Sequence, residues 1–99
     1  MTTYIQLVKW TAQGIETLRD VPTRERVASQ RASSLAGSHT TWFTLGEWDA
    51  VNIIEAPDDE TAAARALEIA GHGNIRTATM RAFSLDEFKA ILARIPPDA

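Results

Sequence analysis

The chain has 99 residues, a net charge of −3 and a hydrophobic content of 44%, values that are ordinary for a globular protein of one domain, here residues 1–99. The negative charge argues against nucleic acid and anionic membranes as partners, because both require basic surfaces. The absence of cysteine excludes disulfides, thiolate metal sites and a cysteine nucleophile. With no secretory signal pattern and no apolar stretch of membrane-spanning length, we expect a soluble cytoplasmic protein.

The first third of the chain predicts a strand and then a helix. Residues 4–10 alternate between two faces, as the side chains of a strand do. Residues 11–20 have no clear period and predict a loop or a short helix. A longer helix is predicted over 23–36, where side chains recur at helical spacing. The positions with this spacing are Val27, Ala28, Arg31, Ala32 and Leu35.

A β-hairpin is predicted at the centre of the chain, over residues 39–57. Its two runs, 40–44 and 50–54, are rich in β-branched and aromatic residues, which suit a pleated surface. Between them, Gly46 can adopt positive φ and Asp49 can bond its own backbone, so a short turn is expected. Both faces of the second run are mainly apolar, which indicates a strand covered on both sides. Because so short a chain has few helices, we expect a second copy of the protein to cover the open face.

A helix and an edge strand are predicted after the hairpin. Asp58 is a suitable N-cap for a helix that reaches Ala70, because its side chain can accept hydrogen bonds from the first turn. A strand follows over 74–83, where Arg76 and Arg81 indicate the edge of a sheet, since charge discourages further pairing. The apolar stripe expected on the helix consists of Ala63, Ala66, Leu67 and Ala70.

A further helix is expected before Pro96, and it completes the fold. Ser84 and Glu87 have the spacing of a capping box at its start. The order strand, helix, strand, strand, helix, strand predicts an α+β ferredoxin-like βαββαβ fold with this helix as a C-terminal addition. Right-handed crossovers place both long helices on one face of the four-stranded antiparallel sheet. The apolar stripe of the last helix consists of Leu85, Phe88, Ile91, Leu92 and Ile95.

Seven short segments, spread over nearly the whole chain, resemble the sequences of a known protein family. They are residues 4–5, 9–11, 13–15, 44–49, 55–60, 73–77 and 81–83. In these segments the chain resembles the GYD-domain family of small bacterial proteins. The Gly-Tyr-Asp triplet that names the family is represented by Gly46, Trp48 and Asp49, with Glu47 inserted. Tryptophan keeps the aromatic ring of the family tyrosine but lacks its hydroxyl.

The resemblance implies a particular way of pairing. The family is similar to the dimeric α/β-barrel superfamily, in which two ferredoxin-like sheets pack face to face. It therefore implies a homodimer, or a higher homo-oligomer, formed through the open sheet face, in agreement with the argument from the hairpin. It carries over no catalytic residue, because the function of the family is unassigned.

Two amide side chains are the sharpest candidates for a binding site. Gln6 and Asn52 are uncharged polar residues among apolar neighbours, in the two strands expected at the centre of the sheet. A buried amide needs hydrogen-bond partners. Each amide therefore either finds its hydrogen-bond partners inside the protein or at a dimer interface, or it orients a small substrate in a pocket. The candidate pocket residues are Tyr4, Gln6, Trp10, His39 and Asn52.

The aromatic residues and histidines indicate packing more than chemistry. Trp10, Trp42 and Trp48 are many for so short a chain, and core or dimer packing is favoured over stacking on a ligand. His39 and His72 are far apart and lack metal-ligand spacing. We therefore expect no metal and no cofactor.

These observations leave three hypotheses for function. The first is a homodimer that is non-enzymatic or binds a small molecule weakly, in a pocket between sheet and helices. The second, by fold analogy alone, is a cofactor-independent monooxygenase or isomerase that acts on a small aromatic or lactone substrate. In that enzyme Asn52 would hold an enolate oxygen, Trp10 would stack on the substrate and His39 would act as the base. The third is a ligand-sensing module that assembles with other proteins.

Overall fold

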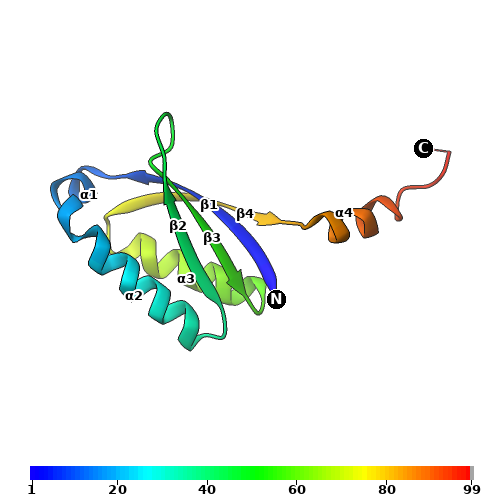
Figure 1. Cartoon of the computed structure of the whole chain (residues 1–99), viewed down its shortest axis with the longest axis horizontal. Coiled ribbons are helices and arrows are strands. Elements are labelled where there is room, and N and C mark those ends of the chain that lie inside the picture. Colours follow the sequence, from blue (N-terminus) through cyan, green and yellow to red (C-terminus); the bar gives the residue numbers. More distant parts are fainter. Residues whose placement is uncertain (99) are drawn as a thin grey trace.

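A computed structural model, which describes residues 1–98, has the predicted α+β ferredoxin-like architecture with an additional C-terminal helix (Figure 1). Four strands form one antiparallel sheet, and a short 3₁₀ turn, η1, joins the first two helices. In chain order the elements are β1 (Thr2–Trp10), α1 (Ala12–Glu16), η1 (Leu18–Asp20), α2 (Val21–Ser34), β2 (Ser38–Phe43), β3 (Ala50–Ala56), α3 (Asp59–Gly71), β4 (Ile75–Ala82) and α4 (Leu85–Leu92).

The sheet has the strand order β2-β3-β1-β4, so β1 and β3 are central and β4 is an edge strand, as predicted. Figure 1 shows α2 and α3 together on one side of the sheet. The side chains of β1 that face these helices, Tyr4, Gln6 and Val8, are buried, whereas Ile5 and Leu7 point to the other face and are half-buried. The helices therefore cover one face only, and both central amides lie on that covered face.

The β-hairpin is confirmed, but its connection is longer and is fixed differently than expected. The loop spans residues 44–49, and Gly46 has a φ of 106°, which glycine adopts readily. Asp49 does not bond its own backbone. Its carboxylate accepts a hydrogen bond from the backbone N–H of Trp10 at 2.9 Å. The loop is thereby tied to the end of β1, and Lys9 lies 5.0 Å from the ring centroid of Trp48 in the same region.

The face of α3 that packs inward differs from the predicted stripe. Ala62 and Arg65 are buried, whereas Leu67 is 74% exposed. The reason is that the Arg65 guanidinium crosses to α2 and donates to the carbonyl oxygen of Ala28 at 3.1 Å. A long polar side chain thus occupies the position between the helices and turns the predicted stripe toward solvent. Two further members of that stripe, Ala63 and Ala70, are exposed as well.

The predicted apolar face of α2 is also only partly used. Ala32 is buried and Ala28 is half-buried, but Val27 and Leu35 are 50% and 41% exposed. The helix contacts the sheet mainly over β2, so a narrow strip of small side chains suffices for packing. The larger side chains at the edges of this strip remain in contact with solvent.

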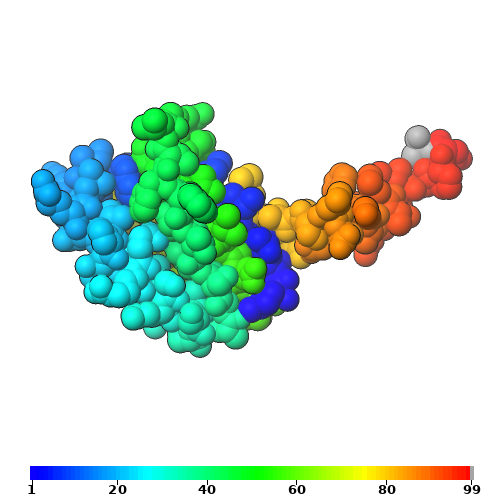
Figure 2. All heavy atoms as spheres, in the orientation of Figure 1, coloured from blue at the N-terminus to red at the C-terminus, as the bar shows by residue number. Residues whose placement is uncertain are grey.

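The C-terminal helix begins as predicted but does not pack on the sheet. Ser84 Oγ accepts from the Glu87 N–H at 3.1 Å, and Glu87 Oε1 accepts from the Ser84 N–H at 2.9 Å, which confirms the capping box. The α-helix ends at Leu92, before the predicted end near Ile95, because the chain tightens into three-residue turns there. Figures 1 and 2 show α4 projecting as an arm, and the molecule measures 55 Å along its longest axis.

Candidate functional site

A row of polar side chains crosses the helix-covered face of the sheet, with one member from each strand. From edge to edge it consists of Thr79, Gln6, Asn52 and Thr41, which the strand registers place opposite one another. Asn52 Nδ2 donates to Gln6 Oε1 at 3.0 Å, and Gln6 Nε2 donates to Thr79 Oγ1 at 3.1 Å. The Thr41 hydroxyl lies 2.7 Å from Asn52 Oδ1. These bonds satisfy two buried amides that would otherwise be costly to desolvate.

The row continues from β2 into α2 through Glu25. The Thr41 hydroxyl donates to Glu25 Oε2 at 2.5 Å, and His39 Nε2 lies 3.1 Å from Thr41 Oγ1 and 3.5 Å from the Glu25 carboxylate. Burial alone would raise the pKa of the Glu25 carboxyl, but hydrogen bonds from His39 and Thr41 outweigh it and lower this pKa below its ordinary value. Glu25 is therefore an ionised acceptor at the end of the row near neutral pH.

The hydroxyl proton of Thr41 can serve either of two acceptors, Glu25 Oε2 or Asn52 Oδ1. When it serves the carboxylate, a half-turn of both amide planes lets Asn52 donate to Thr41, and Gln6 donate to Asn52. The same heavy-atom positions then carry a single line of donors that points toward Glu25. Glu25 is thus linked through one hydroxyl, that of Thr41, to the amides at the centre of the sheet.

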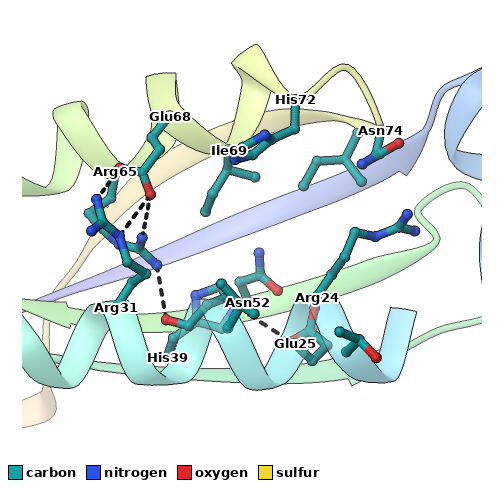
Figure 3. Close-up of a pocket in the computed structure, with 14 residues that line it drawn as sticks. Arg24, Glu25, Arg31, His39, Asn52, Arg65, Glu68, Ile69, His72 and Asn74 are labelled. Atoms are coloured by element: carbon teal, nitrogen blue, oxygen red, sulfur yellow. Dashed lines mark hydrogen bonds and ion pairs between the residues drawn. The ribbon is translucent and has the colours of Figure 1, made fainter. Parts of the chain in front are cut away.

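A cavity of about 290 Å³ lies above this row, between α2, α3 and the sheet (Figure 3). Its volume is at the small end of the range for ligand sites, which suits a molecule no larger than a metabolite. Residues from α2 and β2 form one side, and residues from α3 and the start of β4 form the other. The labelled lining residues are Arg24, Glu25, Arg31, His39, Asn52, Arg65, Glu68, Ile69, His72 and Asn74.

Three charged residues close one end of the cavity and join the two long helices. Arg31 of α2 makes a two-pronged contact with Glu68 of α3, with distances of 2.6 Å and 3.2 Å. Arg65 donates to the same carboxylate at 3.1 Å. The hydrogen bond from Arg31 is the largest cause that lowers the pKa of Glu68. Figure 3 shows the three side chains converging from the two helices.

Two buried nitrogens at the cavity lack a hydrogen-bond partner within residues 1–98. They are Nη2 of Arg24 and Nδ1 of His39. Arg24 uses its other terminal nitrogen to donate to Thr17 Oγ1 at 2.9 Å. Three arginines line the cavity, and two of them, Arg31 and Arg65, share the carboxylate of Glu68. Within residues 1–98, no carboxylate forms a salt bridge with the third, Arg24. An anionic or strongly polar group in the cavity would satisfy it.

A model of the GYD domain matches residues 4–92 of the chain. The chain belongs to the GYD-domain family. A protein of Thermus thermophilus, named glutamine synthetase and cystathionine beta-lyase binding protein, is 33% identical to it over 94 residues, which cover 93% of this chain and 99% of the relative. No solved structure matched the chain significantly.

The described part of this GYD domain, residues 1–98, contains no group of three or more His, Asp and Glu side chains that could hold a metal ion. Within the same residues, no helix combines the length and the apolar character needed to cross a membrane.

The structure brings together three of the five predicted pocket residues of the GYD domain. His39 and Asn52 line the cavity, and Gln6 lies beneath it, bonded to Asn52. Tyr4 is elsewhere, because its hydroxyl donates to the Asp59 carboxylate at the start of α3. Trp10 stacks on Phe43, with ring centroids 6.3 Å apart, and does not line the cavity.

Sequence reasoning missed the charged part of the site. Thr41 could have been found from the hairpin register, because it lies directly opposite Asn52. No sequence pattern of this kind identifies Glu25 or Arg24 as site residues. Their place at the cavity depends on the rotation of α2 about its axis, which the weak apolar pattern of that helix does not fix.

We expect Thr41→Val to destabilise the protein by about 1–3 kcal/mol, because this nearly isosteric change removes the hydroxyl whose single proton serves Asn52 Oδ1 or Glu25 Oε2. The control is Ser29→Ala, which alters an exposed residue of α2 outside the row and should change the free energy of unfolding by less than about 0.5 kcal/mol. Urea denaturation of both variants measures the difference. Equal values for the two would show that the polar row contributes nothing.

Proposed function

We propose that this GYD domain is a homodimeric binding protein that pairs through its open sheet face, as an α/β barrel, and binds a partner protein. The observation that carries the proposal is the apolar character of the sheet face that no helix within residues 1–98 covers. Non-enzymatic binding is supported by the name of the Thermus relative and by the internal use of the polar side chains beneath the cavity.

The open face has two parallel apolar rows across the sheet. In the first, Ile5 lies opposite Ile53 on β3 and Met80 on β4, and in the second, Leu7 lies opposite Val51 and Ala78, with Trp42 beyond Val51. Ile53, Met80 and Trp42 are 40%, 47% and 66% exposed. Monomeric soluble proteins rarely expose so continuous an apolar patch. Two such faces in contact would exclude water from both, as in a sandwich of two sheets.

We expect the protein to be a dimer at micromolar concentration, and Ile53→Glu to weaken this dimer by about 100-fold or more, because an unpaired carboxylate would be buried at its centre. The control is Ile15→Glu, which places the same charge on an exposed site of α1. Light scattering across a dilution series measures both. A wild-type chain that is monomeric at these concentrations contradicts the proposed pairing.

The proposed partner is an enzyme, by similarity to the relative whose name states that it binds glutamine synthetase and cystathionine beta-lyase. We expect the purified domain to bind at least one of these two enzymes from its own host, as measured by surface plasmon resonance. Binding should be lost on heat denaturation of the domain. If neither enzyme binds, the proposed partner is wrong, whatever the oligomeric state.

A second function, binding of a small anion in the cavity, is favoured by the unpartnered nitrogens of Arg24 and His39. The enzyme hypothesis is less well supported, because Trp10 is not among the cavity residues. We expect native mass spectrometry of gently purified protein to detect a retained small molecule, and Arg24→Met to release it. Arg19→Met, which removes an exposed arginine of η1, should retain it. A wild-type mass equal to that of the bare chain would contradict this function.

A further inference from the structure

The C-terminal arm presents an apolar surface that no other element within residues 1–98 covers. All eight residues of α4 are exposed, and the stripe that continues beyond the helix to Ile95 has side chains between 36% and 69% exposed. A helix of eight residues is marginal in water without tertiary contacts. Its apolar and polar sides are nevertheless clearly separated, which is typical of a helix that packs on a surface. Figure 2 shows the arm extending away from the body.

The same chain has a second exposed apolar surface, a groove between α3 and the edge strand β4, with a volume of about 530 Å³. One wall is the stripe of α3 that was expected to pack inward, including Ala63, Ala66 and Leu67. The floor includes Thr79 and Arg81 of the edge strand β4, and both residues are exposed. Small side chains with one large neighbour allow another helix to approach closely and interdigitate.

We propose that α4 of one copy of this chain occupies the α3–β4 groove of a second copy. In a two-fold arrangement the exchange occurs twice, so that two grooves and two stripes are buried together. This contact uses the helix side of each sheet and therefore does not rest on the pairing of open sheet faces proposed above. The exchange explains why the stripe of α4 and the α3–β4 groove are both apolar and both exposed in a single chain.

The charges on the two helices argue against α4 folding back onto its own groove. β3 and β4 both pair antiparallel with β1, so they run in the same direction, and a helix returning from either one runs opposite to both. A folded-back α4 would therefore lie parallel to α3. The acidic first turn of α4, Asp86 and Glu87, would then adjoin the acidic first turn of α3, Asp59 and Glu60. Like charges and parallel helix dipoles disfavour that arrangement.

A helix from a second copy is free to enter the groove in the opposite direction. Antiparallel entry places Lys89 and Arg94, from the C-terminal half of the arm, beside the acidic start of α3 at Asp59 and Glu60. Opposite charges then adjoin at that end of the groove. The start of the arm is fixed to the end of β4, because Arg81 lies 4.5 Å from the ring centroid of Phe83 and 3.9 Å from Glu87.

Cysteine crosslinking tests the exchange cleanly, because the natural chain contains no cysteine. Leu67→Cys is prepared unlabelled and Phe88→Cys is prepared with a heavy nitrogen isotope, and the two are mixed and treated with a short bismaleimide. In the matched control, Ala90→Cys is used in place of Phe88→Cys. Ala90 is also exposed but lies on the opposite side of α4. A chain with both Leu67→Cys and Phe88→Cys is treated in parallel at high dilution.

The expected result is a crosslinked heavy–light pair whose yield is several-fold higher for Phe88→Cys than for Ala90→Cys. Phe88→Glu should lower the stability of the association in light scattering, whereas Ala90→Glu should not. A crosslink formed only within single chains of the double variant would mean that the arm covers its own groove, and would overturn the proposal. Equal yields from the Phe88 and Ala90 positions would overturn it as well, since the stripe would then not face the groove.

Discussion

The structure depends on an imbalance between the sheet and its helices. The central strands carry apolar side chains on both faces, as Leu7 and Val8 of β1 illustrate, but α2 and α3 cover one face only. A sheet in this condition must expose apolar area or share it with another molecule. The fold therefore separates two roles. The covered face contains the polar row and the cavity, and the open face remains available for association.

The polar row gives the covered face a single register. Thr79, Gln6, Asn52 and Thr41 come from four different strands, and each bonds its direct neighbour in the row. A shift of any strand by one residue would turn its member to the open face and leave the remaining amides unsatisfied. Buried polar groups can specify one arrangement at some cost in stability, and here this specification extends across the whole sheet. The cavity lies above this row, between the sheet and the two helices.

Much of this architecture could be predicted from the sequence, since alternation and turn residues are local signals. The burial of Gln6 and Asn52 was predictable because a polar residue inside an apolar strand is conspicuous. Alternation assigns a face but not a position along it, so Tyr4 and Trp10 share the face of Gln6 yet lie away from the cavity. The faces of α2 and α3 were not predictable, because the Arg65 contact between the helices outweighs an alanine pattern.

The exposed apolar surfaces of the domain are better explained by association than by weak packing. A chain of 99 residues buries a smaller share of its surface than a larger domain does, so its isolated core supplies limited stability. Surface that is buried only on association contributes stability that rises with protein concentration. The exposed helix α4 fits this logic. It has a complete capping box but no packing partner within residues 1–98, so it is formed at its start and still available for contact. In the proposed assemblies folding and association would be coupled, and a partner that competes for these surfaces would alter both.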